Sequence, residues 1–126
     1  MIVLDANVII AYLSPTDSHH RAAVGIMRTG AAGGFTSSVL TVAEATVYAT
    51  KLGTQDRTTR ALDELQLEIL PLDEEDVLEL ARIRSQYGLK MPDAVALHAA
   101  IVTRSSLATF DKALASAAAA AGVPVA

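Results

Sequence analysis

Four of the fourteen acidic residues stand in apolar segments of the chain, whereas the other ten lie in polar segments or on amphipathic helices. The four are Asp5, Glu44, Asp93 and Asp111. Asp5 follows four apolar residues, and Glu44 is the only charged residue between Val39 and Tyr48. An ionised carboxylate in apolar surroundings is costly unless a positive charge neutralises it. We therefore predict that these four acids share one site that attracts cations.

The charge of the chain supports this prediction. Lysine and arginine together number 10, and they balance the ten other acids, so the net charge of -4 is carried by the four candidate residues. Neighbouring carboxylates cannot all stay ionised unless cations bind. Oxygen ligands without any cysteine favour Mg²⁺ or Mn²⁺ over zinc. Such ions bridge phosphate oxygens and activate water, which predicts hydrolysis of phosphodiester bonds.

Each acid also has a purely structural interpretation. Asp93, directly after Pro92, suits the positive end of a helix dipole, and Asp111 suits a helix cap. Taken singly, Asp93 and Asp111 are better explained by these structural roles than by a shared site. Glu44 is seven residues from Lys51, too far along a helix for a direct ion pair. Asp5 has no nearby cation in the sequence. Only the joint arrangement of all four acids favours a site.

Alternating strands and helices must bring these residues together. Strands are predicted at 1–4, 35–38, 67–70 and 107–109, with an edge strand at 123–125. Helices are predicted at 8–13, 19–28 with Ser18 as its cap, 39–52, 54–65, 74–87 with Asp73 as its cap, 92–104 and 112–121. The alternation predicts an α/β fold with a mainly parallel sheet and helices on both faces. The helix at 92–104 is apolar almost all round, so we expect it to be buried. Open parallel sheets place ligands at the carboxyl ends of their strands, where the four acids are expected.

Length and composition narrow the class of protein. The 126 residues predict a single domain, and 52% hydrophobic against 19% charged residues predict a globular one. The acidic balance argues against binding nucleic acid through a large basic face, but not against reaching phosphate through metal ions. The apolar stretches are too interrupted for a membrane span. Met1 leads directly into the first strand, so we expect no signal peptide and a cytoplasmic location. His98 is predicted to be packed, and His19 and His20 to be exposed, rather than catalytic.

Four segments occur in the order and spacing of a known family. They are Leu4–Asn7, Ser38–Glu44, Pro92–Ala94 and Ala108–Lys112. Together they cover essentially the whole chain, which resembles the PIN-domain ribonucleases and most closely the VapC-type toxins of toxin–antitoxin pairs. No single segment is specific, and the ordered set carries the resemblance.

The resemblance implies a three-layer α/β/α fold and an endoribonuclease that depends on Mg²⁺ or Mn²⁺. Its implied acidic site is Asp5, Glu44, Asp93 and Asp111, supported by Asn7 and Thr109. It also implies a homodimer and a cognate antitoxin, bound in a groove between the amino-terminal helices and the helix at 39–52. The cations expected near RNA are Lys90, Arg104 and Lys112, each of which equally suits an ordinary soluble surface.

Three other functions remain open from the sequence. A haloacid dehalogenase-like phosphatase also starts with an aspartate after its first strand, but it needs a second aspartate where Asn7 stands. A receiver-like regulatory module needs an adjacent acidic pair, yet Ala6 follows Asp5, and it needs a mid-chain phosphorylated aspartate that is missing. A non-catalytic PIN-like domain that only binds a partner is disfavoured by the intact acids.

Overall fold

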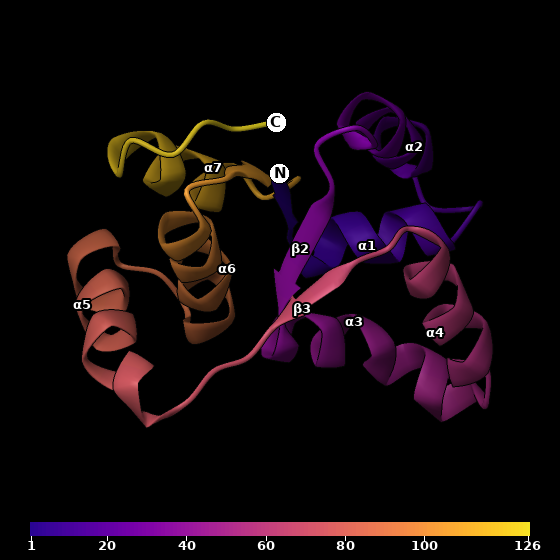
Figure 1. The fold of residues 1–126 in the computed structure, drawn as a ribbon, viewed down its shortest axis with the longest axis horizontal. Helices are drawn as coiled ribbons and strands as arrows, with labels where there is room; N and C mark the ends of the chain where they lie inside the picture. The colour runs from indigo at the N-terminus through magenta and orange to yellow at the C-terminus, as the bar shows by residue number, and fades with distance from the viewer.

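A computed structural model describes all 126 residues, and it contains a parallel sheet of four short strands in the order β3-β2-β1-β4 (Figure 1). The strands are β1 (Ile2–Leu4), β2 (Phe35–Ser38), β3 (Glu68–Leu70) and β4 (Ser106–Ala108). Every pairing between neighbouring strands is parallel. The predicted parallel α/β sheet is therefore confirmed.

Helices cover both faces of this sheet. They are α1 (Ala6–Leu13), α2 (His20–Gly30), α3 (Val39–Leu52), α4 (Gln55–Glu64), a 3-10 turn η1 (Glu74–Asp76), α5 (Val77–Tyr87), α6 (Met91–Thr103) and α7 (Lys112–Ala120). In Figure 1, α5, α6 and α7 lie on one side of the strands, and α1 to α4 lie on the other. The three-layer α/β/α arrangement expected from the sequence is confirmed.

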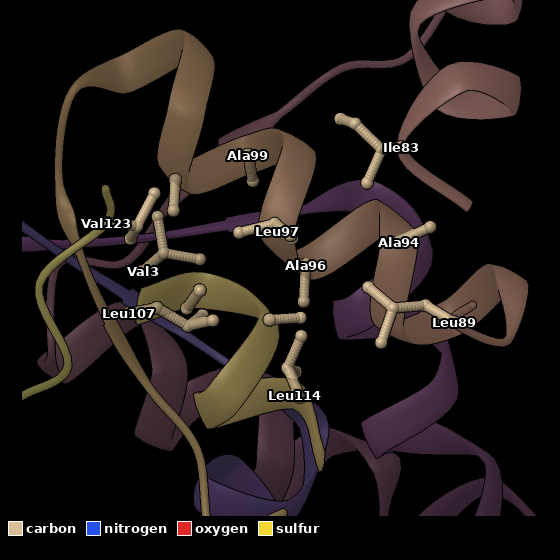
Figure 2. Packing of buried hydrophobic residues seen from close by; sticks show 13 residues of the cluster. Val3, Ile83, Leu89, Ala94, Ala96, Leu97, Ala99, Leu107, Leu114 and Val123 are labelled. Carbon is tan, nitrogen blue, oxygen red and sulfur yellow. The ribbon is translucent and has the colours of Figure 1, made fainter. Parts of the chain in front are cut away.

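Alternation along the strands divides the core into two clusters. Successive strand side chains point to opposite faces, so Val3 packs with α5, α6 and α7, whereas Leu4 packs with α1 to α4. Leu107 and Ala108 on β4 divide in the same way. Figure 2 shows the first cluster, in which Val3, Leu107 and Leu114 approach Leu97 of α6. The central strand β1 is accordingly apolar throughout, whereas β2 carries three buried hydroxyl residues and the edge strand β3 begins with the exposed Glu68.

Helix α6 lies at the centre of the molecule. All residues from 94 to 100 are buried, as the apolar sequence predicts. Many of them are alanines, whose small side chains let the helix approach the sheet closely, and α6 contacts β1, β2 and β4. The first turn of α6, which carries Asp93, is therefore held firmly against the sheet.

Several element boundaries differ from the sequence prediction. Helix α1 begins at Ala6 instead of position 8, because Asp5 caps it. The prediction that Ser18 caps the next helix is wrong: His19 is the N-cap, and its backbone N–H bonds to Asp17. The predicted cap Asp73 is confirmed, but the first turn that it caps is the 3-10 turn η1, and α5 itself begins at Val77.

The carboxyl-terminal segment forms less sheet than predicted, whereas α3 ends where the sequence predicts. The predicted edge strand at 123–125 is reduced to one bridge, in which Val125 pairs with Leu107 beside β4. The end of α3 at Gly53 agrees with the prediction, and this glycine adopts the left-handed conformation, with φ 73°. None of the helices is long and apolar enough to span a membrane.

Candidate active site

Asp5 lies at the carboxyl end of β1, where it caps helix α1. Only 7% of the residue is exposed to solvent. Its Oδ1 accepts a hydrogen bond from the Ala6 backbone N–H at 2.8 Å, and its Oδ2 accepts one from the Thr109 hydroxyl at 2.7 Å. Burial raises the pKa of Asp5, these hydrogen bonds partly oppose the rise, and the charges of Asp93 and Glu44 add to it. No ion pair offsets this cost.

Thr109 connects Asp5 to the end of the neighbouring strand β4. Its hydroxyl oxygen accepts hydrogen bonds from the Asp111 backbone N–H at 3.0 Å and from the Asn7 side chain at 3.4 Å. The side-chain oxygen of Asn7 in turn accepts a bond from the backbone N–H of Phe110 at 3.2 Å. Asn7 and Thr109 therefore hold the loop after β4 against the start of α1, which fits the supporting position expected for them.

Asp93 lies in the first turn of α6 and is half-buried. Burial raises its pKa, as does the charge of Asp111, while the positive charge of Lys90 lowers it. Asp111 is the N-cap of α7, and its Oδ1 accepts a hydrogen bond from the Leu114 backbone N–H at 3.0 Å. The structural role considered for Asp111 is thus confirmed, and the same carboxylate still repels Asp93.

Glu44 lies in the second turn of α3, and its side chain is exposed. It forms no ion pair with Lys51 or with any other cation. Its charge nevertheless reaches Asp5, whose pKa it raises. The structure therefore brings the four predicted acids within electrostatic reach of one another. The charges of Glu44 and Asp93 raise the pKa of Asp5, and the charge of Asp111 raises the pKa of Asp93.

A pocket of about 190 Å³ opens beside Asp5 and Glu44, whereas Asp93 and Asp111 are not among the residues that line it. It is lined by Asp5, Ala6, Leu40, Thr41, Glu44, Met91, Pro92 and Val95. The space greatly exceeds the roughly 10–15 Å³ that a single water requires, so a hydrated ion fits. Thr41 was not predicted to line the site. Its position three residues before Glu44 on the same helix, which places both on one face, is a signal that could have identified it.

The chemistry of the donor set suits a hard divalent cation. All available ligands are carboxylate or hydroxyl oxygens, which bind Mg²⁺ or Mn²⁺, and none of the four acids forms an ion pair within the protein. As the side chains stand, no three His, Asp or Glu residues form a ready-made cluster for a metal ion. Because Mg²⁺ usually keeps several waters and needs only one or two carboxylates, this arrangement still fits such an ion.

The three predicted cations do not all lie near the acids. Lys90 is the N-cap residue of α6 and Lys112 begins α7, so both lie next to acidic residues of the site. Arg104 lies at the opposite end of the 13-residue helix α6, about 17 Å from Asp93 along the helix axis. The structure does not bring Arg104 to the site.

The three histidines are mostly where the sequence places them. His98 is 3% exposed, and its Nε2 lies 3.5 Å from Asp76 Oδ1, which confirms that it is packed. His19 is exposed, as predicted. The expectation for His20 is wrong, since its ring is half-buried with Nδ1 2.8 Å from the Ala11 carbonyl oxygen. Sequence gives no signal for that bond, because it depends on how α2 packs on α1.

Comparison with protein families gives a match over nearly the whole chain. The sequence profile of the PIN domain matches residues 2–120. Comparison with curated protein sequences gives no match.

Several solved structures share the fold. A toxin–antitoxin complex from Klebsiella pneumoniae is 25% identical, with 88% of this chain and 87% of that one covered and a TM-score of 0.73. FitAcB from Neisseria gonorrhoeae is 27% identical, with 99% and 96% covered and a TM-score of 0.75. A structure of FitAB bound to an IR36 DNA fragment is 26% identical, with 100% and 94% covered and a TM-score of 0.73.

Proposed function

This chain belongs to the PIN-domain family, and from that premise we propose that it is an endoribonuclease dependent on Mg²⁺ or Mn²⁺ and the toxin of a toxin–antitoxin pair. The observation that carries the proposal is the state of Asp5. It is buried, it lies beside the charges of Glu44 and Asp93, and no cation of the protein neutralises it. Such an arrangement is costly unless it serves to bind a cation from solution.

Asp5 and Asp93 are the proposed direct metal ligands. Glu44 and Asp111 complete the site directly or through water, and one of them orients the attacking water. A bound divalent cation would polarise the phosphate and lower the pKa of water. Thr109 and the Ala6 backbone N–H keep Asp5 in one orientation, and Asn7 in turn orients Thr109. Lys90, the N-cap residue of α6, and Lys112, the first residue of α7, are the cations proposed to attract the RNA backbone.

The partner proposal rests on the family and on one exposed surface. Similar structures include a toxin–antitoxin complex from Klebsiella pneumoniae. In the present chain, Leu40 and Val47 of α3 are 53% and 49% exposed. We place the antitoxin along α3 and the amino-terminal helices, next to the acidic site, and propose a homodimer in solution. As a toxin that cleaves RNA, the protein would act in the cytoplasm.

The main rival is a PIN domain that binds a partner without catalysis. It gives no reason for retaining four acids that form no ion pair within the protein. Because the chain belongs to the PIN family, the phosphatase and receiver-like alternatives are no longer supported.

The decisive experiment compares Asp5→Asn with the wild type on mixed RNA and on single-stranded DNA, with Mg²⁺, with Mn²⁺ and with a chelator. We expect metal-dependent RNA cleavage by the wild type and at least a hundredfold loss in the variant. Asp56→Asn, which changes an exposed acid of α4, is the matched control and should cleave normally. Circular dichroism checks the fold. Unchanged cleavage by Asp5→Asn, or no cleavage of RNA by the wild type, would refute the proposal.

The toxin assignment has a separate test. A small neighbouring gene that encodes a DNA-binding protein should yield a product that co-purifies with this chain and inhibits cleavage. A neighbouring product that neither binds nor inhibits would contradict this part of the proposal.

A further inference from the structure

The rings of His19 and Phe110 stack beside the acidic site. Their centroids are 4.5 Å apart, and the planes differ by 13°. His19 precedes α2, whereas Phe110 lies in the loop between β4 and α7. Nothing in the catalytic arrangement described above uses this pair, which we call the aromatic platform.

The platform is fixed to the acidic site through its inner ring. Phe110 stands between Thr109 and Asp111 in the chain, and its backbone N–H donates to the Asn7 side chain at 3.2 Å. Asn7 and Thr109 belong to the hydrogen-bonded network around Asp5. The position of the Phe110 ring is therefore tied to that of the buried carboxylate.

The outer ring has a polar contact of its own, because its Nδ1 lies 3.5 Å from the Ser18 hydroxyl oxygen, and the backbone around it is fixed. The backbone N–H of His19 donates to Asp17 Oδ1 at 2.8 Å, and the next residue, His20, lies 2.8 Å from the Ala11 carbonyl oxygen. The inner face of the His19 ring is covered by Phe110, yet 55% of the side chain remains exposed. One ring face is thus open to solvent and already oriented, which lowers the entropic cost of binding a flat ligand.

We propose that the exposed face of His19 stacks on an unpaired RNA base next to, or one removed from, the cleaved phosphodiester bond. This inference rests on the proposed endoribonuclease function. Proteins bind unpaired bases by stacking them on aromatic side chains, and such contacts tolerate many sequences. An acidic chain with a net charge of -4 gains little from phosphate contacts, so stacking supplies affinity that cations cannot. The Asp17 Oδ1 atom lies 3.8 Å from His19 Nδ1.

The alternative is that His19 only shields Phe110 from water. That interpretation predicts a loss of stability when His19 is removed, but no effect that depends on the RNA base. The two interpretations are therefore separated by changing the substrate as well as the protein.

The test uses steady-state cleavage of a short unpaired RNA by the wild type, His19→Ala, His19→Phe and Arg21→Ala. We expect His19→Ala to raise KM about tenfold with little change in kcat, as for one lost stack. His19→Phe retains the ring and should stay close to the wild type. Arg21→Ala removes an exposed cation from the same helix and serves as the control. A substrate with an abasic residue at the stacked position should abolish the difference between wild type and His19→Ala.

A second readout does not need cleavage. The chain contains three tyrosines but no tryptophan, so His19→Trp introduces a single tryptophan that can be excited selectively at long wavelength. An RNA base stacked on it should quench the fluorescence, and the abasic RNA should not. If the wild type cleaves RNA but His19→Ala keeps its KM, the platform is refuted while the endoribonuclease function stands. If the wild type cleaves no RNA, that function fails, and absence of quenching then also refutes the platform. A His19→Ala variant with normal KM but weaker antitoxin binding would assign the rings to the protein partner and overturn the inference.

Discussion

The Thr109 hydroxyl donates a 2.7 Å hydrogen bond to Asp5 Oδ2, across a sequence separation of 104 residues. The bond joins the ends of the adjacent parallel strands β1 and β4. Because the same oxygen accepts bonds from the Asp111 backbone and the Asn7 side chain, one hydroxyl positions a buried carboxylate and the loop beyond β4. Such partners of a metal ligand orient it and tune its affinity.

Thr109→Val should weaken divalent-metal binding by about 10- to 100-fold, the range typical for the loss of a residue that orients a ligand. Valine has the shape of threonine but cannot donate to Asp5 or accept from the Asp111 backbone. Thr109→Ser keeps the hydroxyl and is the matched control. Metal titration followed by thermal unfolding measures the affinity. Equal affinities in Thr109→Val and Thr109→Ser would contradict the assigned role.

Mg²⁺ or Mn²⁺ should stabilise the wild type at neutral pH. A ligand that binds only the folded state adds about 2.7 kcal/mol to the free energy of unfolding at one hundred times its Kd. Glu44→Gln should reduce this metal-induced gain, whereas Glu64→Gln, an exposed change on α4, should preserve it. Thermal unfolding with and without metal gives the result, and an equal gain in both variants would remove Glu44 from the site.

Asp93→Asn should stabilise the metal-free protein at neutral pH. Burial and the charge of Asp111 raise the pKa of Asp93, so its ionised form costs folding energy. The gain should be about 0.5 kcal/mol, at the low end of stabilising substitutions because solvent screens a half-buried group. With the pKa higher in the folded state, protonation relieves the cost in the wild type. The difference in unfolding free energy between variant and wild type should therefore shrink as the pH falls from 7 to about 4. A difference that grows on acidification would show the opposite sign of the pKa shift.

Gly30→Ala should destabilise the fold by about 1–3 kcal/mol, as expected for overpacking. A Cβ atom at this position would lie 2.6 Å from Ile2 Cδ1 and 2.7 Å from Cε1 of the buried Phe35 ring. Gly25→Ala, in the same helix α2, meets nothing within 4 Å. That control should gain about 0.5–1 kcal/mol from the higher helix propensity of alanine. Chemical denaturation measures both, and equal effects would mean that α2 does not pack tightly on β1 and β2.

The sequence by itself determined the elements and the identity of the acids. The helical spacing of apolar residues and the glycine that follows them predicted α3 at 39–52 with Gly53 as its end, because these signals act over a few neighbouring residues. It also separated Asp5, Glu44, Asp93 and Asp111 from the other acids, since a charge in an apolar run has a cost that is visible locally. The order of strands and helices then implied one shared edge of the sheet. The assignment of roles among the four acids stays a prediction.

Only the tertiary structure decided how those residues meet. The bonds from Thr109 to Asp5 and from Phe110 to Asn7 depend on the register of β1 with β4, which no local pattern specifies. The contact of His19 with Phe110 likewise depends on how α2 packs against α1. Contacts between distant segments are set by packing and strand register. For this reason the candidate residues could be predicted from the sequence, whereas the hydrogen bonds and ring contacts between them could not.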